Sequence, residues 1–140
     1  MAEFKKNTGI LVNTYLYSTK GNQFESYTLA ASAVTQADAN GNKYVNKGEL
    51  MAKITSGALS GKVGPYEAGV SDGREDVANL VGYNDTWALL TDAMDRDIAC
   101  LQVGIVDNTK VIVDLVKGAP NSTITDALRT VGLDILHRPV

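Results

Sequence analysis

One stretch of the sequence has the residue types and spacing of a calcium-binding loop. The first, third, fifth and twelfth positions of such a loop supply oxygen ligands to the cation. The sixth position requires glycine for a sharp turn, but here it is Lys43, which brings a positive charge into the site. Neither flank has the pattern of an amphipathic helix, so we interpret residues 38–42 as an exposed polar loop. The four oxygen-bearing residues are Asp38, Asn40, Asn42 and Glu49.

Other residues that could do chemistry are isolated from suitable neighbours. Asp92, Asp95 and Asp97 could act in acid–base catalysis or bind a hard cation, but no histidine accompanies them. His137 and Cys100 are the only residues of their types, which excludes a metal centre built from several of them. The chain has no Gly-x-Ser-x-Gly elbow, and a thiol in an apolar run is usually buried. We therefore expect no catalytic residue, no metal and no cofactor, and a protein that is not an enzyme.

Two further patterns could bind ligands. Glycines at positions 57 and 61 precede Lys62, but their spacing does not match a phosphate-binding loop and no helix follows. Several aromatic residues could form a stacking surface, although Tyr and Trp on strands more often pack in a core or a subunit interface. We favour packing for this set, which comprises Tyr15, Tyr17, Tyr66, Tyr83 and Trp87.

The composition is that of one globular domain. The chain has 140 residues, of which 44% are hydrophobic and 21% charged, enough to bury a sizeable core. No apolar run approaches the roughly 20 residues that span a bilayer. The first residues are charged and lack the apolar block of a signal peptide, so we expect an intracellular origin and no membrane association.

Charge is distributed unevenly along the chain. Residues 1–24 carry one acid and three lysines, a balance of +2, whereas residues 67–97 carry eight acids and two arginines, a balance of −6. Nucleic-acid binding depends on several Lys or Arg residues that neutralise phosphates, and no such stripe occurs. We therefore do not expect a nucleic-acid partner.

Turn residues and alternating apolar residues predict a mainly β domain over residues 10–140, preceded by a mobile arm at residues 1–9. One short helix is expected after Pro120, with capping-box spacing from Thr123 to Asp126 and an end at Gly132. The strand at 98–106 is expected to form a hairpin with 110–116. The predicted strands cover residues 10–17, 23–29, 43–46, 49–55, 77–83, 87–90, 98–106, 110–116 and 133–138.

Residues 62–74 are predicted to be a shaped connector between two sets of strands. Gly64, Gly69 and Gly73 can adopt positive φ, and Pro65 fixes its own φ. The glycines therefore indicate backbone geometry in preference to a cradle for a ligand.

A series of short motifs resembles the lambda-type head decoration proteins of tailed bacteriophages. The resemblance covers roughly residues 27–116, and its specificity lies in the order of the motifs. They are Tyr27-Thr-Leu29, Asn46-Lys-Gly-Glu-Leu-Met-Ala-Lys53, Gly64-Pro-Tyr66, Ser71-Asp-Gly-Arg-Glu75, Ala78-Asn-Leu-Val-Gly82 and Asp97-Ile-Ala-Cys-Leu-Gln-Val-Gly104-Ile-Val106. The sequence departs from the family in its 38–42 loop and in its C-terminal helix and strand.

The resemblance implies a β-clip-like or small β-barrel domain that forms homotrimers. It also implies a capsid cement protein, made in the host cytoplasm, that binds major capsid protein on the outer surface of the expanded head without cofactor or catalysis. In such a fold, residues 62–74 would form a structural bend. The bend residues are Gly64, Pro65, Tyr66, Asp72 and Gly73.

The N-terminal arm, together with the strand predicted at residues 10–16, is the expected shell-binding segment. Its positive charge and mobile composition favour a segment that orders on the shell by adding a strand to an exposed sheet edge. The residues expected to carry this contact are Phe4, Lys5, Lys6, Ile10 and Val12.

Two other classes of protein remain as alternatives. One is another virion module, such as a tail or fibre-base domain or a receptor-binding β domain. The other is a nucleotide hydrolase, since dUTP pyrophosphatases are also β-clip trimers, but their acidic substrate motifs and glycine-rich C-terminal motif have no match here.

Overall fold

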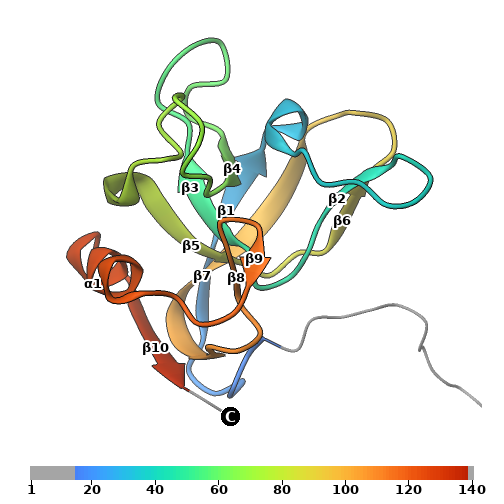
Figure 1. Cartoon of the computed structure of the whole chain (residues 1–140). Helices are drawn as coiled ribbons and strands as arrows, with labels where there is room; N and C mark the ends of the chain where they lie inside the picture. The colour runs from blue at the N-terminus through green and yellow to red at the C-terminus, as the bar shows by residue number, and fades with distance from the viewer. Residues whose placement is uncertain (1–14, 139–140) are drawn as a thin grey trace, which may run out of the picture.

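The computed structural model describes residues 15–138, which form a mainly β domain with one short C-terminal α-helix (Figure 1). This confirms the predicted fold class. The strands are β1 (Gln23–Leu29), β2 (Lys43–Val45), β3 (Leu50–Lys53), β4 (Val63–Pro65), β5 (Leu80–Asn84), β6 (Ala88–Leu90), β7 (Arg96–Asp107), β8 (Ile112–Val113), β9 (Val116–Lys117) and β10 (Asp134–Arg138). The helices are α1 (Ser122–Thr130) and two 3-10 turns, η1 (Ala31–Ala33) and η2 (Val77–Asn79).

Five strands close into a ring, to which β10 adds a sixth strand. The order is β1-β4-β3-β5-β7-β10, and β1 also pairs with β7, which closes the ring. The β1–β7 pairing is antiparallel and extends along all of β1, whereas β1 meets β4 only at Leu29 and Val63. The ring is therefore held most firmly on the side of β7.

Strand β7 has partners along both edges. One edge pairs with β1 and, further along, with residues 15–17, where Leu16 bridges Val106 and the Tyr17 N–H donates to the Ile105 carbonyl (2.9 Å). The other edge pairs with β5 at Cys100 and Leu101, and then with β10 in parallel from Val103 to Asp107. Residues 10–14 of the predicted first strand lie outside the described residues.

A bulge in β5 lets the ring curve. The register with β3 shifts at Gly82, whose φ is +117°. A Cβ on Gly82 would lie 2.2 Å from the Leu101 carbonyl oxygen, so only glycine allows β5 and β7 to approach this closely.

Two hydrophobic cores lie on opposite sides of the sheet. The first lies under α1 and includes Leu50, Tyr83, Leu101 and Leu128. The second lies towards β2 and β6 and is built from residues that alternate with those of the first on β3 and β7, including Met51, Ile98 and Cys100. Burial on both sides explains why β7 is apolar at nearly every position from Ile98 to Val106.

Helix α1 covers the first core through Ile124, Ala127 and Leu128. Its N-cap is Asn121, whose side-chain oxygen accepts from the Ile124 N–H (2.9 Å), so the predicted capping box starting at Thr123 is wrong. Thr123 lies one residue inside the helix, where its hydroxyl is not at the cap position. Gly132, with φ of +94°, follows the helix as predicted.

Two of the predicted strands are corrected by the structure. Residues 110–116 do not return along β7, because β1, β5 and β10 already occupy its edges; they enter a separate small hairpin of β8 and β9. Residues 77–79 form η2 instead of strand, because the Asp76 side chain accepts from the Ala78 N–H (2.9 Å) and caps a helical turn.

Gly82→Ala should destabilise the protein by about 3 kcal/mol or more, because it adds a backbone clash to an unfavourable φ. Gly57→Ala is the matched control, since Gly57 also has positive φ (+79°) but nothing lies near its added Cβ. It should cost only about 1 kcal/mol. Urea unfolding of both variants measures the difference, and equal losses would contradict the close-approach explanation.

Candidate functional site

The predicted bend at residues 62–74 begins as a strand. Gly64 and Pro65 lie in β4, where Pro65 pairs with Met51, and the Tyr66 N–H donates to the Leu50 carbonyl (2.9 Å). Pro65 is therefore the last residue of a paired strand, and the predicted bend at residues 62–74 begins within the sheet. A strand end accepts proline because one missing N–H interrupts little of the ladder.

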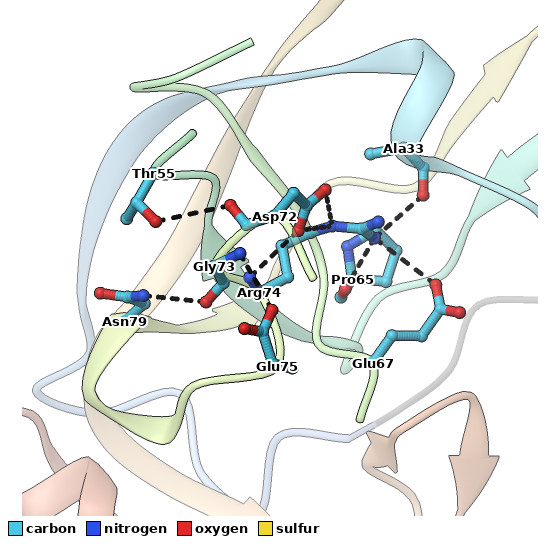
Figure 2. Close-up of polar contacts among 9 residues, drawn as sticks. All are labelled: Ala33, Thr55, Pro65, Glu67, Asp72, Gly73, Arg74, Glu75 and Asn79. Atoms are coloured by element: carbon cyan, nitrogen blue, oxygen red, sulfur yellow. Dashed lines mark hydrogen bonds and ion pairs between the residues drawn. The ribbon is translucent and has the colours of Figure 1, made fainter. Parts of the chain in front are cut away.

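The bend residues Asp72 and Gly73 lie in a turn that is tied to the segment just after β3 (Figure 2). The Asp72 carbonyl accepts from the Thr55 N–H (2.9 Å), and Gly73 has φ of +110°. The Gly73 N–H donates to the side chain of Glu75 (2.9 Å). The structure thus brings Asp72 and Gly73 together in one turn.

Arg74 is the centre of this segment, and its side chain is 6% exposed (Figure 2). Its Nη1 donates to the backbone carbonyls of Ala33 and Pro65, each at 3.1 Å, and its Nε donates to the Asp72 carboxylate at 3.0 Å. Glu67 lies 3.4 Å from Nη1. One guanidinium therefore joins η1, the end of β4 and the turn at Asp72.

Sequence reasoning treated Arg74 only as part of a motif. The available signal was its position as the single cation among four acids, Glu67, Asp72, Glu75 and Asp76. Two of those acids contact the guanidinium. Part of the −6 balance of residues 67–97 is therefore neutralised within the fold. These contacts give residues 62–74 a structural role.

The four residues at the ligand positions of the calcium-like loop do not converge on a common point. The Asp38 carboxylate accepts from the backbone N–H groups of Asn40 and Asn42, each at 2.9 Å, which closes an exposed turn. Glu49 is 1% exposed, and its carboxylate accepts from the Gln36 side chain instead. Within residues 15–138 there is no group of three or more His, Cys, Asp or Glu residues placed to hold a metal ion.

Glu49, which the sequence indicated only as a possible calcium ligand, is a buried acid. One of its oxygens, Oε2, is buried and has no hydrogen-bond partner among the described residues. Burial raises the pKa of Glu49 to about 7, although hydrogen bonds from Gln36 and the Asn46 backbone act in the opposite direction. The sequence gives no signal for this, because the carboxylate is enclosed by residues distant in the chain.

The three aspartates before and within β7 have separate structural partners. Asp92 pairs with Arg96 (3.0 Å), while Asp95 pairs with Lys62 and accepts from the Ala31 N–H (2.9 Å). Asp97 accepts from the Thr28 hydroxyl at 3.4 Å. The hydrogen bonds to Asp92 and Asp95 lower the pKa of both carboxyls. These side chains fasten loops to neighbouring elements.

Cys100 and His137 belong to different parts of the fold. Cys100 lies in the second core, where burial raises the pKa of its thiol to about 12. His137 on β10 contacts the Tyr83 hydroxyl through Nε2 (2.7 Å), and burial lowers its pKa to about 4. The contact between His137 and Tyr83 joins β10 to β5 across β7. The sequence did not indicate it, because the two residues are far apart in the chain.

The aromatic residues divide into packed and exposed groups. Tyr15 and Tyr83 are buried, with ring centres 6.5 Å apart, and Tyr15 donates to Asp85 (2.8 Å). Tyr66 packs against the first core. Tyr17 and Trp87 are 49% and 41% exposed. Packing therefore accounts for three of the five rings.

The expected shell-binding residues, Phe4, Lys5, Lys6, Ile10 and Val12, lie outside the described residues. Comparison of the chain with protein-family models, curated proteins and solved structures gives no match. Among the helices of residues 15–138, none is long and apolar enough to cross a membrane.

Arg74→Met should lower the free energy of unfolding by roughly 3 kcal/mol, because it removes the side-chain donor of two carbonyls and the ion pair with Asp72. Arg129→Met is the matched control: its pair with Asp126 is 79% and 72% exposed, and its loss should cost less than about 1 kcal/mol. Urea unfolding checks both. Similar losses in the two variants would show that the Arg74 contacts contribute no more than a surface pair.

Glu49 should make the protein less stable as pH rises. Its pKa is about 7 in the folded state and 4.5 ordinarily, so its contribution is fully present below pH 4.5 and is lost as pH rises through 7. The total loss is about 3 kcal/mol. Glu49→Gln should remove this pH dependence. In urea unfolding, the stability of the variant relative to the wild type should therefore be higher at pH 8 than at pH 5. An unchanged slope would mean that Glu49 ionises normally.

Proposed function

We propose that this chain is a bacteriophage head decoration protein, a cement protein that binds major capsid protein on the outer surface of the expanded head. The observation that carries the proposal is the ordered series of motifs across residues 27–116. The motifs contribute residues to all five strands of the ring, β1, β3, β4, β5 and β7. The resemblance therefore concerns one connected architectural unit and not scattered loops.

The way the polar residues are used also supports a binding role. Arg74, Asp92 and Asp95 engage neighbouring elements, and Glu49 is enclosed. These interactions organise the domain and bring no acid, base and nucleophile together. A protein that acts by contact requires a stable shape with accessible surfaces, which this arrangement supplies.

Cementing follows from simultaneous weak contacts. A homotrimer that touches several shell subunits gains affinity through effective concentration, even when each contact alone is weak. The arm at residues 1–9 supplies one such contact per subunit by adding a strand to a sheet edge on the shell. The described residues begin at Tyr15, whose carbonyl accepts from the Asp107 N–H at the end of β7 (2.7 Å).

Deletion of residues 2–9 should abolish binding to expanded heads while the domain remains folded. Co-sedimentation with purified expanded heads measures binding, and circular dichroism checks the fold. Retained binding would contradict the role of the arm, whereas failure of the full chain to sediment with heads, or its binding to tails instead, would contradict the decoration function.

Charge in the arm can be tested separately. Lys5→Glu with Lys6→Glu should weaken head binding at low salt, because it reverses two of the positive charges of residues 1–24. Lys43→Glu with Lys53→Glu is the matched control, since both lysines are exposed on the described domain. Equal weakening by the two pairs would indicate a general charge effect and not an arm contact.

A further inference from the structure

Among residues 15–138, strand β10 is an edge strand with one unpaired side. It ends the sheet order, and within residues 15–138 its only strand partner is β7. Figure 1 shows β10 at the margin of the domain, with α1 as its neighbour in the chain. An exposed edge of this kind offers a row of backbone donors and acceptors to another strand.

The backbone of β10 has a defined orientation. The Arg138 carbonyl accepts from the Asn108 N–H (2.9 Å), so Arg138 directs its backbone groups towards β7. Because these groups alternate along a strand, Asp134 and Leu136 also face β7. Ile135 and His137 therefore direct their N–H and C=O groups to the free edge.

The side chains alternate in the same way. Ile135 packs against the first core and His137 contacts Tyr83. Asp134, Leu136 and Arg138 are exposed on the opposite face, and Leu136 is 50% exposed. The exposed face of β10 thus carries an acid, a leucine and a base at regular spacing.

This order is self-complementary. When the segment Asp134-Ile-Leu-His-Arg138 is placed antiparallel to a copy of itself with Leu136 at the centre, Asp134 lies opposite Arg138 of the second copy, and the reverse pair forms as well. The two leucines meet at the centre. Opposite charges and apolar pairs across an antiparallel ladder are stabilising, whereas like charges are destabilising.

We propose that β10 pairs antiparallel with β10 of a second copy of this chain, across a two-fold axis at Leu136. Ile135 and His137 of each copy then form the hydrogen-bonded positions. Leu136 and the Asp134–Arg138 pairs occupy the non-hydrogen-bonded positions, where side chains approach most closely. The contact is isologous, because both copies use the same five residues.

The neighbouring surface favours a second copy over an unrelated strand. Tyr17, Ile105 and Leu136 lie in one row, because Ile105 pairs with Leu136 on one side and bonds to the Tyr17 backbone on the other. Two-fold pairing makes this row continuous between copies. The Arg138 guanidinium lies 5.6 Å from the centre of the Tyr17 ring, so it stays on the exposed face of the sheet and turns from Tyr17 toward the free edge to meet Asp134 of the second copy.

The contact is small, so it should be weak in isolation. Pairing of five residues per copy buries far less area than a stable dimer interface. The inference does not require shell binding, and a two-fold contact at β10 leaves the other surfaces available for three-fold association.

Sedimentation velocity of the full chain over about a hundredfold concentration range, up to about 1 mM, tests the pairing. The expected result is a concentration-dependent doubling of mass, which three-fold association does not produce. Asp134→Arg alone and Arg138→Asp alone should each weaken the association about tenfold, because each places like charges opposite one another twice. The double variant, Asp134→Arg with Arg138→Asp, should restore it to within about threefold of wild type.

Recovery of association in the double variant shows that the single variants lose strand pairing and not their fold, because all three variants alter the same exposed positions. Circular dichroism should report the same fold in each. Absence of any doubling in the wild type would overturn the proposal, as would single variants that associate like the wild type. Failure of the folded double variant to recover would also overturn it.

Discussion

Strand β7 imposes the main constraint on this structure, because both of its edges and both of its faces are occupied. The two edges pair with β1, β5, β10 and residues 15–17, and its side chains enter two separate cores. Every element that closes the ring contacts β7 directly or pairs with a strand that does. The bulge at Gly82 is the local adjustment that lets β5 share an edge of β7 with β10.

Local sequence patterns correctly predicted the strands and the helix end that depend mainly on neighbouring residues in the chain. The alternation over 23–29, the apolar run at 98–106 and the glycine after α1 correspond to β1, β7 and the end of the helix. The β7 hairpin was predicted wrongly because edge occupancy is decided by strands distant in the chain. The Arg74 contacts and the burial of Glu49 were missed for the same reason: their partners lie on separate elements.

The end of β7 near Asp107 is paired on both edges. Residues 15–17 pair with one edge and β10 pairs with the other. The buried Arg74 side chain has a structural role, because its hydrogen bonds join three segments of the domain. A closed ring with an open strand edge suits a protein that we propose to act through repeated contacts on a shell.

Cryo-electron microscopy of expanded heads incubated with the purified protein tests the proposed function most directly. The account predicts added density on the outer surface at local three-fold positions, into which the ring of residues 15–138 fits with Tyr15 directed towards the shell. Heads without added density, or density in which the end of β7 near Asp107 points away from the shell, would contradict it.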